Sequence, residues 1–301
     1  MTAAAPRRVA MLINPRAGRG RAAAAAVTAA DRLTRAGVVV EQIIGADAAG
    51  SAARARAALD TGPDALVVVG GDGAVHQGLQ LLRGRDIPLG IVPAGTGDDH
   101  ARAYGLPRGD AAAAADVVLG GKVRRVDLGR VRADGGVDTV FGTVLATGFD
   151  SLVTDRTNRM RWPRGRMRYN LAVVAELANL RPLDFRLETG DGRVFRRQVV
   201  LVAAGITDSY GGGMRITPGA DPADGLLQVT VIGHVPRRRL LRVFPQVFTG
   251  AHVHHPQVET LRTDRLRISA RGITAYADGE RIAPLPVEVT AERGALALLV
   301  P

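Results

Sequence analysis

Short apolar runs alternate with amphipathic, often alanine-rich stretches between residues 9 and 120. The apolar runs predict strands over residues 9–14, 38–44, 64–70 and 87–93. The other stretches predict helices over residues 19–36, 50–60, 74–84, 98–105 and 110–120. Strands that are apolar throughout and alternate with helices are typical of a parallel sheet covered on both faces. We therefore predict an α/β domain over residues 1–125.

The pattern changes near Lys122. Strand-like runs now cover residues 123–148, 185–206, 225–233, 265–282 and 285–300, and Asp-Gly, Gly-Gly or Arg-Gly turns break them. Only residues 166–180 predict a helix in this part. Closely spaced strands with turn signals indicate an antiparallel β-sandwich, which we expect over residues 126–290.

Composition narrows the class of protein. The 301 residues include no cysteine, which excludes disulfide frameworks and thiolate zinc sites. No run reaches the roughly 20 apolar residues of a membrane span, and no signal peptide is recognisable at the start, so we expect a cytoplasmic protein. The net charge of +11 favours anionic partners. The codon bias of an arginine-rich genome would explain this charge equally well. Nucleic acid is disfavoured, because aromatic residues make up only 4% and RNA-binding motifs are absent.

Three glycine-rich loops follow predicted strands and begin predicted helices: NPRAGRG (14–20), GGDG (70–73) and PAGTGDD (93–99). In a parallel sheet these loops share the carboxyl edge of the strands, where ligands usually bind. Glycines let backbone N–H groups approach a phosphate, and a helix N-terminus attracts its charge. Each loop alone could be a tight turn, but together they predict a phosphate site.

These three loops, with DGE at 278–280, resemble the bacterial diacylglycerol kinase family of lipid kinases, and the resemblance covers essentially the whole chain. NAD kinases share GGDG but fit the later motifs poorly. The resemblance implies a nucleotide-binding domain and a lipid-substrate domain with a cleft between them, and residues 291–301 returning to the first domain. It implies ATP-dependent phosphorylation of diacylglycerol or a similar lipid alcohol, with Mg²⁺ as cofactor, and it suggests a homodimer.

The resemblance also assigns residues. Asp72 is expected to be an active-site carboxylate that orients nucleotide or metal, and Glu280 to be the base for the lipid hydroxyl, with Asp278 beside it. The residues implied to hold ATP are Asn14, Pro15, Arg16, Ala17, Gly18, Gly71, Asp72, Gly73, Ala74, Val75, His76, Gln77, Gly95 and Thr96. Asp224 and the carbonyls of Asp221 and Leu226 match a structural magnesium site, which suits a hard cation. Without the other motifs, ADGE would predict only a solvated hairpin turn.

Several positions depart from the family pattern. Ala74 stands where threonine is usual, and His76 and Gln77 replace an Asn-Glu pair. Asp98 replaces asparagine, and His100 replaces an apolar residue. Backbone N–H contacts survive these changes, but the side-chain contacts are altered, since Ala74 lacks a hydroxyl and Gln77 lacks a charge. An active lipid kinase, an impaired nucleotide- or lipid-binding homologue and a kinase of a soluble substrate, as in NAD kinases, therefore stay open. The retained acidic residues favour the first.

Two further segments invite interpretation. Residues 156–168 are densely basic and hold the single tryptophan, Trp162. They could bind an anionic membrane surface from the cytoplasmic side, or form a solvated connector with Trp162 packed inside. The HVHH segment at 252–255 lacks an adjacent acidic or cysteine ligand, so we expect an exposed loop there.

Overall fold

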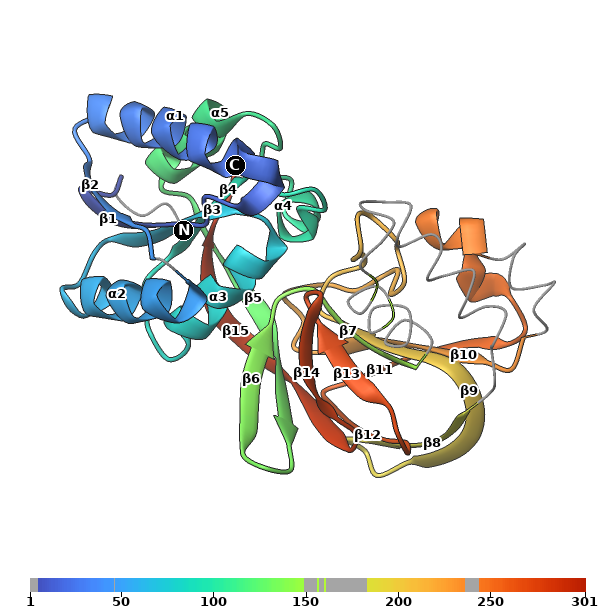
Figure 1. Cartoon of the computed structure of the whole chain (residues 1–301). Helices are drawn as coiled ribbons and strands as arrows, with labels where there is room; N and C mark the ends of the chain where they lie inside the picture. The colour runs from blue at the N-terminus through green and yellow to red at the C-terminus, as the bar shows by residue number, and fades with distance from the viewer. Residues whose placement is uncertain (1–4, 46, 149–155, 157–159, 161–182, 236–243) are drawn as a thin grey trace. The chain divides into compact units, whose positions relative to one another are not determined.

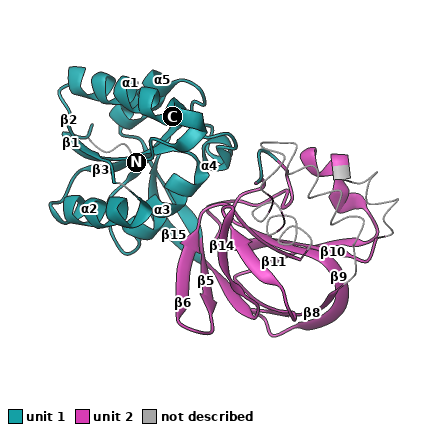
Figure 2. Ribbon diagram, viewed as in Figure 1, with its two compact units in different colours: residues 1–128, 211–213, 292–301 teal, residues 129–210, 214–291 magenta. Residues whose placement is uncertain are grey.

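The computed structural model describes residues 5–45, 47–148, 156, 160, 183–235 and 244–301. The chain forms two compact units (Figure 2). Unit 1 comprises residues 1–128, 211–213 and 292–301, and unit 2 comprises residues 129–210 and 214–291. The predicted helix at 166–180 and most of the basic segment, including Trp162, lie outside the described residues.

Unit 1 is built on a parallel sheet in the order β2–β1–β3–β4. Its strands are β1 (Arg8–Ile13), β2 (Val39–Ile43), β3 (Ala65–Gly70) and β4 (Leu89–Pro93). Strands β3 and β4 are buried along their whole length, as their uniformly apolar sequences predict. The last strand, β15 (Val287–Leu299), runs parallel to β4 through the pair Leu298–Leu89.

Helices cover both faces of this sheet (Figure 1). Helices α1 (Arg21–Arg35) and α5 (Ala111–Gly120) lie on one face, and α2 (Ala48–Asp60) and α3 (Asp72–Leu82) lie on the other. The short helix α4 (Asp99–Ala103) follows β4. The described residues contain no helix that is both long and apolar enough to cross a bilayer.

Three helices begin two residues away from the predicted start, and of these α2 begins at Ala48 instead of residue 50. A 3₁₀ turn, η1 (Ala17–Gly20), precedes α1, which begins at Arg21 because Gly18 and Gly20 adopt φ of 58° and 92°. Helix α3 begins at Asp72, two residues earlier than expected, and so places that carboxylate in its first turn.

Unit 2 is antiparallel. Its sheet runs in the order β14–β13–β7–β9–β8–β12–β15. Strand β10 pairs with both β9 and β11, and strand β5 pairs with both β15 and β6. The strands are β5 (Val123–Ala133), β6 (Val137–Phe141), β7 (Val144–Gly148), β8 (Leu183–Thr189), β9 (Val194–Gly205), β10 (Leu227–Gly233), β11 (Val258–Thr263), β12 (Arg265–Ser269), β13 (Thr274–Ala277) and β14 (Glu280–Pro284). Their inward side chains, among them Phe141, Phe185 and Leu227, form the core.

The expectation of an exposed HVHH loop is wrong for its first histidine. Short 3₁₀ turns, η2 (Phe244–Phe248) and η3 (Ala251–His254), occupy this region. His252 is fully buried, its Nε2 lies 3.3 Å from the carbonyl oxygen of Ile216, and burial lowers its pKa. Its role is therefore packing within unit 2.

Candidate functional site

The three glycine-rich loops meet at the carboxyl edge of the unit 1 sheet. A Cβ added to Gly18 would lie 1.9 Å from the carbonyl oxygen of Ala94, and one added to Gly71 would lie 3.0 Å from the Cα of Gly95. The N–H of Ala94 donates to the carbonyl of Gly70 over 2.8 Å. Backbone thus packs directly on backbone, so the loops form one continuous surface that larger residues would push apart.

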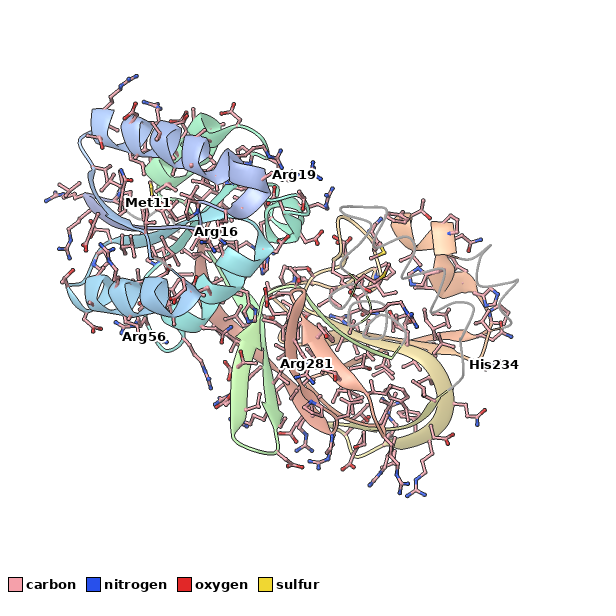
Figure 3. All side chains as sticks on the ribbon, viewed as in Figure 1. Met11, Arg16, Arg19, Arg56, His234 and Arg281 are labelled. Carbon is pink, nitrogen blue, oxygen red and sulfur yellow. The ribbon has the colours of Figure 1, made fainter. Side chains whose placement is uncertain are left out.

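Arginines lie in the first loop and at the start of the helix that follows it. Arg21 bridges two loops, since its Nε donates to the carbonyl of Gly18 at 3.1 Å and its Nη2 to the carbonyl of Gly95 at 2.6 Å. Arg16 and Arg19 are exposed on the first loop (Figure 3). Fixed positive charge beside glycine backbone is suited to a polyphosphate.

The helices differ in how their N-termini are capped. Asp47 caps α2 through the N–H of Gly50, and Asp110 caps α5 through the N–H of Ala113. No side chain caps α1 or α3, whose N-cap residues are Gly20 and Gly71. The first N–H groups of a helix have no intrahelical partner. The N–H of Arg21 at α1 donates to the carbonyls of Ala17 and Gly18, and the N–H of Ala74 at α3 donates to the carbonyl of Gly71 at 2.9 Å. At both helix starts no side-chain cap competes with an anion for the other first-turn N–H groups.

Asp72 is bound to the start of α4. Its Oδ1 accepts hydrogen bonds from the backbone N–H of Asp99 at 2.7 Å and of His100 at 3.2 Å, and lies 3.2 Å from Nδ1 of His100. Burial acts to raise the pKa of Asp72, but the His100 side chain and these backbone donors outweigh it and hold the pKa below its usual value. Asp72 is therefore a fixed anion near neutral pH.

Two further carboxylates follow in the same loop. Asp98 adopts a left-handed φ of 50°, and its Oδ1 accepts from the N–H of Gly95 at 2.8 Å. Asp99 accepts from the N–H of Gly212 at 2.9 Å. Burial raises the pKa of both Asp98 and Asp99, and the charge of Asp72 contributes to each shift. Asparagine, which the family pattern has at this position, also tolerates this left-handed conformation.

The structure shows what surrounds Ala74 and Gln77, two residues after GGDG that depart from the family pattern. The Ala74 side chain is buried, 3% exposed, against Gly70, so the start of α3 closes around a methyl group. Gln77 donates from Nε2 to the carbonyl of Ala48 at 2.7 Å and thereby ties α3 to α2. Thr96, by contrast, is exposed on its loop.

The DGE turn lies in unit 2 between β13 and β14. Asp278 is only 7% exposed, with φ of 52°. Its carboxylate accepts from the N–H of Gly142 at 3.0 Å, and from the N–H and hydroxyl of Thr143 at 2.9 and 2.6 Å. Glu280, two residues on, is exposed. The turn is a hairpin, but Asp278 anchors it to the β6–β7 corner and leaves the Glu280 carboxylate to face solvent.

The residues of the predicted magnesium loop do not fit the ion as they lie. Asp224 Oδ2 pairs with Arg262 of β11, and its Oδ1 accepts from the N–H of Leu226 at 2.8 Å. The Oδ1 of Asp221 accepts from the N–H of Ala223 at 3.1 Å. A guanidinium therefore already neutralises the one firm side-chain anion. Magnesium at this loop stays a prediction, and it requires the Asp224–Arg262 pair to open.

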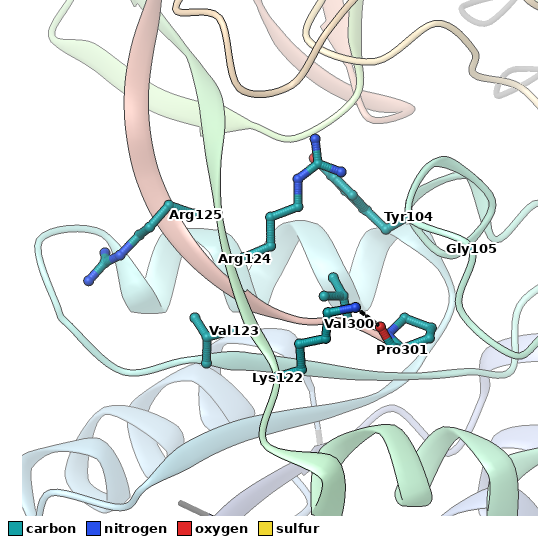
Figure 4. A pocket seen from close by; sticks show the side chains of 8 residues that line it. All are labelled: Tyr104, Gly105, Lys122, Val123, Arg124, Arg125, Val300 and Pro301. Carbon is teal, nitrogen blue, oxygen red and sulfur yellow. Dashed lines mark hydrogen bonds between the residues drawn. The ribbon is translucent and has the colours of Figure 1, made fainter. Parts of the chain in front are cut away.

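Unit 1 also has a hollow of about 680 Å³, lined by Tyr104, Gly105, Lys122, Val123, Arg124, Arg125, Val300 and Pro301 (Figure 4). Within its lining, Lys122 donates to the carbonyl of Pro301 at 2.7 Å and Arg125 pairs with Asp86. None of the predicted site residues lines this hollow.

Both halves of the chain are similar in sequence to known protein families. Residues 8–131 match the diacylglycerol kinase catalytic domain, and residues 143–300 match the YegS C-terminal NAD kinase beta sandwich-like domain. A diacylglycerol kinase of Mycobacterium tuberculosis is 50% identical over 294 residues, which cover 98% of this chain and 95% of that protein. A diacylglycerol kinase of Bacillus subtilis is 28% identical over 229 residues, 75% of this chain and 74% of that protein.

Solved structures agree in fold. A crystal structure of a diacylglycerol kinase from Bacillus anthracis superposes with a TM-score of 0.73 at 18% identity, covering 98% of this chain and 97% of the other. An NAD kinase from Archaeoglobus fulgidus in complex with ATP has a TM-score of 0.51 at 15% identity, covering 97% and 92%. The predicted fold class, α/β followed by antiparallel β, is confirmed, and so is the resemblance drawn from the motifs.

Proposed function

Because the chain belongs to the diacylglycerol kinase family, we propose that it transfers the γ-phosphate of ATP to the hydroxyl of diacylglycerol or of a similar lipid alcohol. The identity of 50% to a diacylglycerol kinase, which extends over 98% of the chain, carries this proposal. The continuous surface of three glycine-rich loops supports ATP as the donor.

Unit 1 would hold the nucleotide. Phosphoryl transfer requires the phosphates to be positioned and their charge to be offset. Donors at the uncapped starts of α1 and α3, and the arginines of the first loop, suit these tasks. Magnesium supplies further charge neutralisation when bound. Asp72 and Asp99 come from different loops and meet at Gly97, where an added Cβ would lie 2.9 Å from Asp72 Oδ2 and 3.5 Å from Asp99 Oδ2.

Unit 2 would supply the base. The exposed Glu280 carboxylate takes the proton of the lipid hydroxyl. The hydroxyl oxygen attacks the γ-phosphorus of ATP, and ADP leaves. A positioned general base contributes on the order of 10²–10⁴-fold to such a step. Asp278, whose oxygens are bonded to the β6–β7 corner, acts in this scheme by fixing the turn that carries Glu280.

A catalytically impaired homologue is the second candidate. The buried methyl group of Ala74 and the hydrogen bond from Gln77 to Ala48 favour it, because position 74 has lost the hydroxyl of the family pattern and position 77 has lost its charge. Such a protein would bind nucleotide or lipid without turnover.

The full chain, incubated with γ-labelled ATP and magnesium, should label diacylglycerol, ceramide or sphingosine in mixed micelles. Labelled phosphatidic acid or its analogue on a chromatogram supports the proposal. Labelled product with NAD alone would instead indicate a soluble substrate, and ATP binding without any labelled acceptor would indicate the impaired homologue.

We further propose peripheral association with the anionic inner face of the membrane, supported by the net charge of +11. The chain should sediment with phosphatidylglycerol vesicles and be released by high salt. Equal sedimentation with neutral phosphatidylcholine vesicles would contradict this route. Homodimer formation stays a prediction from the resemblance.

A further inference from the structure

We propose that His100 is a positioning residue for Asp72, whose carboxylate it orients through an Nδ1–H donor. The inference rests on the proposed function in one respect, which is that Asp72 serves phosphoryl transfer. His100 stands where the family pattern has an apolar residue, so its side chain brings a contact that the pattern lacks.

Three donors converge on a single oxygen. Oδ1 of Asp72 lies 2.7 Å from the N of Asp99, 3.2 Å from the N of His100 and 3.2 Å from the Nδ1 of His100. The two backbone donors are available whatever residue occupies position 100. The third donor alone depends on the histidine side chain.

The second oxygen of Asp72 faces a different direction. A Cβ placed on Gly97 would lie 2.9 Å from Oδ2, on the side where Asp99 Oδ2 also lies, at 3.5 Å. Rotation of the carboxylate would exchange the two oxygens. By adding a side-chain bond to Oδ1, His100 opposes this rotation and keeps Oδ2 directed at the space beside Gly97.

Burial makes the imidazole contact effective. The His100 side chain is 3% exposed and that of Asp72 is 21% exposed. Water competes little with a hydrogen bond at such a depth. An ionised carboxylate only accepts hydrogen bonds. Because Oδ1 of Asp72 lies 3.2 Å from Nδ1 of His100, we infer that Nδ1 carries the hydrogen.

Three substitutions separate orientation from packing. His100→Asn keeps an N–H donor on an atom bonded to Cγ, as Nδ1 is, whereas His100→Gln moves the same amide one bond further out. His100→Leu restores the apolar type of the family pattern. For each variant we would measure lipid-kinase kcat and KM for ATP, together with ATP affinity and melting temperature.

We expect His100→Asn to keep kcat within about threefold of the wild type. His100→Gln and His100→Leu should lose about tenfold or more in kcat, as expected for a lost charge-assisted hydrogen bond, while ATP affinity changes less than threefold. Equal kcat in the Asn and Gln variants, at any level, would overturn the inference. So would a loss of kcat that follows melting temperature across all three.

Failure of the proposed function would be recognised separately, because the wild type would then phosphorylate no lipid. The ¹⁵N resonances of the His100 ring decide the inference in that case. A hydrogen on Nδ1 whose signal shifts in Asp72→Asn supports the hydrogen bond. A ring that carries its hydrogen on Nε2 alone, or that is insensitive to Asp72→Asn, overturns it.

Discussion

Asp278→Asn should destabilise unit 2 while leaving the backbone of the DGE turn in place. Asn tolerates the left-handed φ of 52° found at Asp278, so the substitution changes chemistry more than conformation. The carboxylate accepts from the N–H of Gly142 on one oxygen and from the N–H and hydroxyl of Thr143 on the other. The amide has only one oxygen, so its NH₂ group must face at least one of these backbone N–H groups.

The cost follows from that mismatch. A buried N–H that loses its acceptor costs about 1–3 kcal/mol, and the remaining bonds lose their charge assistance. We therefore expect Asp278→Asn to lower the free energy of unfolding by about 3 kcal/mol. Thr143→Val, which removes only the hydroxyl donor at 2.6 Å, should cost about 1 kcal/mol.

Equilibrium urea unfolding of the wild type, both single variants and the double variant measures these costs. The double variant should lose less than the sum of the singles, because both substitutions act on the same hydrogen bond, the one from the Thr143 hydroxyl to the Asp278 carboxylate. If Asp278→Asn costs under about 0.5 kcal/mol, or less than Thr143→Val, the carboxylate is not the anchor of the turn.

Three other predictions follow from contacts in the two units. Gly18→Ala should lower the melting temperature more than Gly20→Ala. Both glycines have positive φ, but only a Cβ at Gly18 would meet a carbonyl oxygen, at 1.9 Å. Equal losses of melting temperature would contradict the close packing of the loops. Burial raises the pKa of Asp98 above 3.8, so its ionisation destabilises the folded state progressively as pH rises through the folded pKa. Asp98→Asn should therefore raise the melting temperature more at pH 7 than at pH 4. A larger gain at pH 4 would contradict a raised pKa at Asp98. Arg262→Gln should increase the rise in melting temperature caused by magnesium, because it frees Asp224; an unchanged magnesium response would argue against a site at that loop.

Much of unit 1 is predictable from sequence for a simple physical reason. Parallel strands buried on both faces must be apolar throughout, and the valine run that forms β3 satisfies this without ambiguity. Glycine-rich turns after such strands must share one sheet edge. The meeting of the three loops therefore follows from pattern and topology.

Contacts between distant residues were not predictable in this way. The sequence marked His100 only as a departure, because nothing local shows that residue 100 reaches Asp72, 28 positions earlier. Asp278 presents a hairpin signal that is the same whether the turn is solvated or anchored to Thr143, 135 residues away. The burial of His252 was not predictable for the same reason, because the polar residues next to it in the sequence do not indicate how it packs in the folded chain.

The most direct test of the account is the phosphorylation of diacylglycerol by Glu280→Gln, measured beside the wild type with γ-labelled ATP. Glu280 is exposed at the start of β14, and Gln keeps its shape but cannot take the hydroxyl proton. The account predicts a loss of turnover on the order of 10²–10⁴-fold, with ATP affinity and melting temperature unchanged. Glu41→Gln, at an exposed position of β2, serves as the matched control and should keep full activity. Wild-type turnover in Glu280→Gln, or an equal loss of ATP affinity, would contradict the assignment of Glu280 as the base.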